Sequence, residues 1–240
     1  MIVKQKKIKI KEIDITFLAR NSSRSIRISI TQVKGVRVFV PLFVSFSSAK
    51  SFVISKINWI NKHITKIEKL KSEKTIFKTG FIFNTKLSAI EFKLAPIDKI
   101  KSINNNNSIE ILIPEDIIIK SSNCQLEIRS EIEKILRRDA KNYLPKRVSY
   151  FAEKFDFHYK KVTIKNAKTR WGSCSSINNI NLNLHLMRLT DELIDYVILH
   201  ELVHTKIKNH QKEFWDLLDI VSGDAKGLDR ELKKHHIHTY

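Results

Sequence analysis

Polar and apolar residues alternate along much of the first 120 residues, with the period of two that is typical of β-strands. Four short runs show this pattern most clearly: residues 7–11, 14–17, 25–30 and 36–40. From residue 47 to 70 the apolar positions recur at intervals of three and four, which predicts a helix. A second β-rich stretch follows over about 75–119. We therefore expect a β-rich N-terminal region over residues 1–120.

The second half of the chain carries longer helical patterns and less β structure. Its apolar spacing predicts a helix over about 123–155, in which Pro145 marks a break or a kink. Two alternating runs, at 161–165 and 180–184, predict short strands. A further helix is expected to begin near residue 190 and to run through a group of histidines. Together the elements predict an α+β fold in which residues 121–240 form a C-terminal domain.

The chain is strongly basic, with 44 Lys and Arg residues against 25 Asp and Glu residues and a net charge of +19. Such a charge attracts polyanions, so association with nucleic acid through a basic surface is one expectation. The lysines are spread along the chain and accompany many Ile and Asn residues, which also fits a bias in codon usage. Charge alone therefore does not identify a binding surface.

The cysteine content and the N-terminus favour a cytoplasmic protein. Cys124 and Cys174 are the only cysteines, too few for a disulfide framework. Lysines interrupt the first ten residues, so the apolar core of a signal peptide cannot form there. The most apolar early stretch, residues 36–46, is too short to span a bilayer. We expect neither a membrane segment nor a membrane partner.

The candidate chemistry lies in the sequence His200-Glu201-Leu202-Val203-His204. Residues four apart share one face of a helix, so His200 and His204 can offer ring nitrogens to the same metal ion. Glu201 then lies close enough to act as the base for a water molecule at that metal. Apolar neighbours on both sides indicate a buried helix, where a carboxylate without a function would be costly. Two satisfied histidines on an ordinary helix are the competing interpretation.

A catalytic zinc ion normally has three protein ligands and one open position. His210 follows His204 after five residues, enough for the helix to end and the chain to turn back toward the metal. His210 is therefore the preferred third ligand, and Zn²⁺ is the expected cofactor. Cys174 is the alternative third ligand, as in deformylase-like zinc amidases, which combine the same motif with an upstream cysteine. A measurement of zinc content in variants of Cys174 and His210 separates the two.

Several segments together resemble a known family. They are Arg170-Trp171-Gly172-Ser173-Cys174, Ile180-Asn181-Leu182-Asn183, Asp195 to His204, Asn209-His210 and Phe214-Trp215. In order and spacing they are similar to the YgjP-like zinc metallopeptidases, which are related to the SprT-like and WLM metalloproteases. The resemblance covers about residues 160–220 and, more weakly, the β-rich N-terminal half.

The resemblance implies zinc bound by His200, His204 and His210, with Glu201 as the catalytic base. It also implies a minimal zincin-like C-terminal metallopeptidase domain that hydrolyses peptide bonds in a protein or peptide substrate. A different class of function stays open, namely a basic nucleic-acid-binding protein whose metal site is only structural. The intact Glu201 weighs against it, because a structural zinc has no use for a base.

Two further parts of a peptidase site have candidates in the sequence. The oxyanion of the tetrahedral intermediate needs a hydrogen-bond donor, for which Arg170, His185 and Tyr196 are considered. A substrate that is held by backbone pairing needs a strand at the edge of a sheet, and the run from Ile180 to Leu184 is a candidate.

Overall fold

In the computed structural model, the alternating runs near the N-terminus form a four-stranded sheet in the order β1-β2-β4-β3. Strands β2 and β4 run parallel, and the other neighbours are antiparallel. The four strands are β1 (Ile2–Ile10), β2 (Ile13–Arg20), β3 (Arg27–Thr31) and β4 (Gly35–Pro41). The structure describes residues 2–31, 34–72, 75–105 and 108–237.

The helix expected over 47–70 is observed as two helices, α1 (Phe46–Ser55) and α2 (Ile57–Ser72), which are separated at Lys56. One face of the sheet packs against these helices and buries its apolar residues there. The resulting core contains Ile10, Ile15, Phe17, Val36, Val38, Val40, Ala49, Val53, Ile57 and Ile60. The opposite sheet face has no helix in this core.

A second sheet follows in the order β5-β6-β8-β7. Its strands are β5 (Ile82–Asn84), β6 (Ala89–Ala95), β7 (Lys101–Asn105) and β8 (Ser108–Pro114). The long helix α3 (Ser122–Lys154) comes next and matches the expected range closely. Pro145 lies inside α3, and the helix continues to Lys154 instead of ending there. A proline removes only one hydrogen bond of a helix, and buried residues on both sides, Leu144 and Val148, hold this turn in the core.

The last part of the chain combines a small sheet with three helices. The sheet has the order β10-β11-β9 and consists of β9 (Lys161–Lys165), β10 (Gly172–Cys174) and β11 (Asn179–Asn183). The short 3-10 helix η1 (Leu184–Arg188) leads into the helices α4 (Asp191–Lys206), α5 (Lys212–Ser222) and α6 (Ala225–Leu232). Strand β10 lies at one edge of this sheet, so the segment Arg170-Trp171-Gly172-Ser173-Cys174 provides an edge strand, whereas the candidate run from Ile180 to Leu184 lies mostly in the central strand β11.

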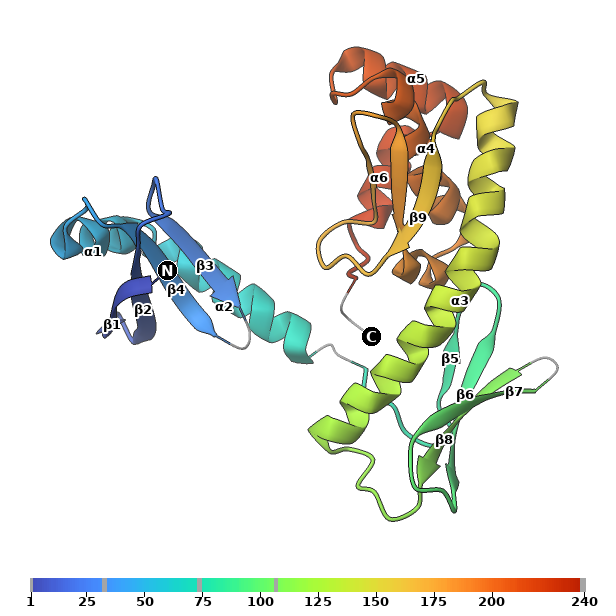
Figure 1. Ribbon diagram of the computed structural model, residues 1–240, viewed down its shortest axis with the longest axis horizontal. Helices are drawn as coiled ribbons and strands as arrows, with labels where there is room; N and C mark the ends of the chain where they lie inside the picture. Colours follow the sequence, from blue (N-terminus) through green and yellow to red (C-terminus); the bar gives the residue numbers. More distant parts are fainter. Residues whose placement is uncertain (1, 32–33, 73–74, 106–107, 238–240) are drawn as a thin grey trace. The chain divides into compact units, whose positions relative to one another are not determined.

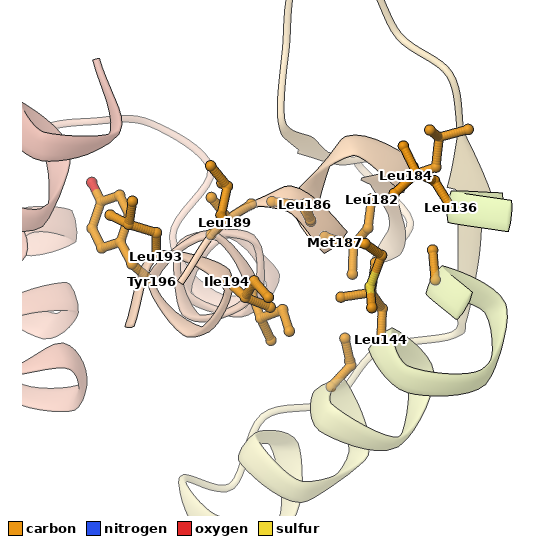
Figure 2. Packing of buried hydrophobic residues seen from close by; sticks show 14 of the residues in the cluster. Leu136, Leu144, Leu182, Leu184, Leu186, Met187, Leu189, Leu193, Ile194 and Tyr196 are labelled. Atoms are coloured by element: carbon orange, nitrogen blue, oxygen red, sulfur yellow. The ribbon is translucent and has the colours of Figure 1, made fainter. Parts of the chain in front are cut away.

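Helix α4 is buried on nearly all sides. Its apolar residues face α3, β10, β11, α5 and α6, and its exposed residues lie at its two ends, Asp191 and Glu192 at the start and Lys206 at the end. Figure 2 shows Ile194 of α4 on the side of the helix toward Met187 of η1 and Leu144 of α3, and Leu193 on the side of Leu189 and Tyr196. A helix that is packed in this way holds its side chains in fixed positions, which is what a reactive site requires.

By its contacts the chain divides into the units Met1–Lys74 and Thr75–His238 (Figure 1). The expected boundary near residue 120 differs from this division. The reason is that β6 and β8 share one hydrophobic core with α3 and α4, so the second β region belongs with the C-terminal half. The mixed α+β class expected from the sequence is confirmed. No helix within the described residues is long and apolar enough to cross a membrane.

Candidate functional site

Three histidine rings meet beside the C-terminal half of α4. His200 and His204 lie one turn apart on α4, and His210 lies in the segment that joins α4 to α5. The Nε2 atom of His210 is 3.1 Å from that of His200 and 3.1 Å from that of His204. The three residues form a group whose ligand atoms all lie within 4.8 Å of one another. The sequence-predicted metal ligands are thus brought together.

Each of the α4 histidines is held in a form that can bind a metal. Nδ1 of His204 lies 2.9 Å from the carbonyl oxygen of Ile207 and donates to it, which leaves Nε2 with its lone pair. Burial, followed by the charges of His204 and His210, lowers the pKa of His200 to about 3. Burial also lowers the pKa of His204. Both rings are therefore neutral near pH 7, as metal coordination requires.

The ring of Phe214 in α5 packs against all three imidazole rings. Its ring centroid lies 4.9, 4.5 and 4.6 Å from the centroids of His200, His204 and His210. The side chain is fully buried. In the sequence Phe214 belongs to one of the segments that carry the family resemblance, but no local pattern shows that it packs against histidines distributed over two segments.

Glu201 is buried beside the histidines and touches the edge strand. Only 5% of the residue is exposed, and Oε2 has no hydrogen-bond partner within the described chain. A Cβ atom placed on Gly172 would lie 2.5 Å from Oε1 of Glu201, so β10 approaches this carboxyl group as closely as a residue without a side chain allows. Burial raises the pKa of Glu201 to about 8, and the charge of Arg170 opposes that rise.

The three candidates for the oxyanion donor lie in different surroundings. Nε2 of His185 is 3.2 Å from Oδ1 of Asn166, in the loop that follows β9. Tyr196 is buried one turn before His200 with its ring centroid 6.0 Å from that of the histidine, and its hydroxyl has no hydrogen-bond partner in the described residues. Arg170 is exposed, just before β10.

Cys174 ends the edge strand and is not a member of the histidine group. Its Sγ atom is 3.5 Å from the carbonyl oxygen of Ser175 and 4.0 Å from Nζ of Lys208. Burial raises the pKa of its thiol. The geometry therefore favours His210 over Cys174 as the third ligand.

Comparisons with known proteins agree with a peptidase site. A family model described as "YgjP-like, metallopeptidase domain" matches residues 24–235. Among solved structures, two metallopeptidase zymogens are similar: jannalysin of Methanocaldococcus jannaschii and abylysin of Pyrococcus abyssi. Both are 24% identical and cover 38% of this chain. The match covers 94% of jannalysin, with a TM-score of 0.35, and 93% of abylysin, with a TM-score of 0.34. The search of curated proteins finds no match.

Proposed function

The chain belongs to the YgjP-like metallopeptidase family, and on that premise we propose that His200, His204 and His210 bind a catalytic zinc ion and that Glu201 is the general base. The convergence of the three Nε2 atoms is the observation that carries the proposal. Nitrogen ligands at about 2.0–2.1 Å around a tetrahedral ion lie roughly 3.3–3.4 Å apart, close to the spacing of these atoms. Three imidazoles and an adjacent carboxylate suit zinc better than a hard cation such as magnesium.

In this proposal the chain's own residues position a water molecule and move its proton. When it is bound, zinc supplies Lewis acidity that polarises the peptide carbonyl and makes water acidic near pH 7. Glu201 takes a proton from the attacking water as the new C–O bond forms. It returns that proton to the amide nitrogen as the C–N bond breaks, which yields a carboxylic acid and an amine.

The two rival functions of this metal site are less well supported. A deformylase-like ligand set needs Cys174 as a metal ligand. The Sγ atom of Cys174 instead contacts Ser175 and Lys208, and Cys174 is not a member of the histidine group. A purely structural site gives no reason to bury a carboxyl group whose Oε2 has no partner within the described chain. We also propose a cytoplasmic location, with which the free state of both cysteines agrees.

Removal of the metal tests the proposed function directly. We expect the full-length protein to cleave a mixture of quenched fluorogenic peptides, and a zinc chelator to stop cleavage by depriving the reaction of its Lewis acid. Addition of one equivalent of zinc to the dialysed protein should restore the rate, and magnesium should not. Cleavage that persists after verified removal of bound metal contradicts the proposal.

Gly172→Ala is expected to lower the turnover number about 100-fold, with little change in bound zinc. Its added methyl group would displace Glu201, whose Oε1, Cγ and Cδ atoms would lie 2.5, 2.7 and 2.9 Å from it, and misplacement of a reacting group by about 1 Å costs that much. Turnover and zinc content are both measured. Because the effect passes through Glu201, the same change in a Glu201→Gln background should cause little further loss. A 100-fold loss in that background too would show that Gly172 acts in another way.

A separate observation favours association with nucleic acid through the unit Met1–Lys74. These 74 residues contain 17 Lys and Arg against 4 Asp and Glu, so they carry +13 of the net charge of +19. The charge is thus concentrated, although the lysines look evenly spread in the sequence. Such a density of positive charge attracts the phosphates of a nucleic acid.

Part of this charge lies on the sheet face opposite α1 and α2. Arg37 and Phe39 alternate with the core residues of β4 and therefore face away from the helices. The guanidinium carbons of Arg20, Arg27 and Arg37 lie 4.4, 5.0 and 5.5 Å from the ring centroid of Phe39. We propose that this arginine group contacts the phosphate backbone of nucleic acid.

Neutralising the arginine group should weaken binding and its dependence on salt. If Arg20, Arg27 and Arg37 each contact one phosphate, replacing all three by Gln lowers the slope of log K against log salt by about 2–3. Fluorescence anisotropy with a labelled oligonucleotide measures the slope. The matched control replaces three exposed lysines of the helices, Lys50, Lys62 and Lys66, by Gln. If both variants lose affinity and salt dependence equally, only the total charge matters and the arginine group is not a specific contact.

A further inference from the structure

A cavity of about 390 Å³ opens beside the edge strand β10. Residues from the end of β9, from the loop between β9 and β10 and from the strands β10 and β11 line it: Lys165, Asn166, Arg170, Trp171, Gly172 and Asn183 among them. Gly172 belongs both to this wall and to the contact with Glu201. The cavity therefore adjoins the carboxyl group that is proposed to act on the peptide bond.

The loop that carries Arg170 is held in place by a buried side chain. Asn183, at the end of β11, is only 1% exposed. Its Nδ2 atom donates to the carbonyl oxygens of Ala167 at 2.8 Å and of Arg170 at 2.9 Å. Its backbone N–H donates to the carbonyl oxygen of Trp171 at 2.8 Å. These three bonds fix the backbone at Arg170, so the cavity wall is a built feature of the fold.

The charged residues that line the cavity are both positive. Lys165 and Arg170 line the cavity, and no Asp or Glu does. Within the described part of the chain, neither cation forms a hydrogen bond or an ion pair through its side chain. The remaining polar lining consists of asparagine side chains and Ser173, and Trp171 adds an apolar surface. Such a wall fits a carboxylate on a short apolar stem, because a guanidinium group binds a carboxylate through two parallel hydrogen bonds.

We propose that this cavity is a substrate subsite that binds a carboxylate of the peptide close to the scissile bond, through Arg170 and Lys165. The inference rests on the proposed peptidase function of the adjoining site. Two sources supply the same chemistry, namely an Asp or Glu side chain of the substrate and the carboxylate of its C-terminus. Arg170 is then a specificity-determining residue that recognises substrate rather than the reacting atoms.

Matched peptides distinguish the two sources. In the first pair, Glu or Gln stands next to the scissile bond in an otherwise neutral peptide with an amidated C-terminus. In the second pair all side chains are neutral, and the C-terminus is either free or amidated. For the zinc-loaded full-length protein we expect the charged member of one pair to have a kcat/KM at least tenfold higher, mainly through a lower KM. The pair that shows the difference identifies the source.

The variant Arg170→Gln should reduce this preference, the ratio of kcat/KM between the charged and the neutral member of the pair, to about unity. Lys165→Gln should reduce it in part, and Arg170→Lys should retain part of it. Lys161→Gln removes the same charge from an exposed position on β9 outside the cavity and should keep the full preference. Far-ultraviolet circular dichroism and thermal unfolding confirm that each variant folds.

Two outcomes overturn the subsite. One is a preference that Arg170→Gln leaves intact, or no preference in either pair. The other is an equal fall in kcat for charged and neutral peptides, which would make Arg170 a donor to the oxyanion. Affinities of the same peptides for zinc-loaded Glu201→Gln, measured by fluorescence anisotropy, separate this inference from the proposed function. If the protein cleaves no peptide while this variant still prefers the carboxylate, the subsite stands and the proposed reaction fails.

Discussion

Replacing Glu201 by Gln is expected to lower kcat/KM for peptide hydrolysis by about 10²–10⁴-fold, the range typical of a lost general base. Glutamine has nearly the same shape as glutamate, so it keeps the packing against Gly172 but cannot accept the proton of the attacking water. The position is only 5% exposed, and Oε2 has no protein partner in the described residues, so the neutral amide leaves no ion pair broken. Initial rates with a quenched peptide measure the effect.

The metal content is the control for this variant. Glu201 is not one of the three proposed metal ligands, so Glu201→Gln should retain one equivalent of zinc and the thermal stability of the parent. A loss of zinc would indicate that Glu201 takes part in binding the metal. A kcat/KM within tenfold of the parent, with zinc in place, would exclude Glu201 as the general base.

The second large effect is expected from His210→Ala, which should abolish both stoichiometric zinc binding and hydrolysis. Two imidazoles remain after the change, and a catalytic zinc site normally requires three protein ligands. His210 is exposed and lies between α4 and α5, so its removal should leave the fold intact. Zinc is measured by inductively coupled plasma mass spectrometry after gel filtration.

Two matched variants sharpen the test of the third ligand. Cys174→Ser should keep its zinc, because Cys174 is outside the histidine group. His158→Ala removes a histidine whose side chain is 86% exposed and should also keep it. If Cys174→Ser empties the site and His210→Ala does not, the ligand set is wrong and the chemistry of a zinc amidase with a cysteine ligand becomes the better explanation.

The grouping of the three proposed metal ligands could be predicted from the sequence because their placement is local. His200 and His204 are four residues apart on one helix, and His210 follows after a single break in that helix. Their juxtaposition depends on helix geometry and one turn rather than on the packing of distant segments. The long helix α3 was predictable for the same reason, since its spacing repeats over many residues.

Contacts between distant segments were not predictable in the same way. The packing of α4 against β10 places Gly172 beside Glu201, although 28 residues separate the two in the sequence. Alternation showed that residues 180–184 form a strand but not that β11 lies in the middle of its sheet. The boundary at Lys74 also depends on the hydrophobic core into which the side chains of β6 and β8 pack. The alternation of polar and apolar residues predicts a strand but not the core against which that strand packs.

The contact of Phe214 with all three imidazole rings links the site to the local unfolding of α5. When α5 unfolds locally, Phe214 moves away from the imidazole rings. His210 precedes α5 by two residues and loses its fixed position too, so only two of the three proposed metal ligands stay in place. A metal that binds only the closed form therefore raises the free energy of opening, by about 4 kcal/mol at a concentration 1,000 times its dissociation constant. Backbone amides of α5 thus exchange their hydrogens more slowly as the site fills, which makes their protection a measure of metal occupancy without a substrate.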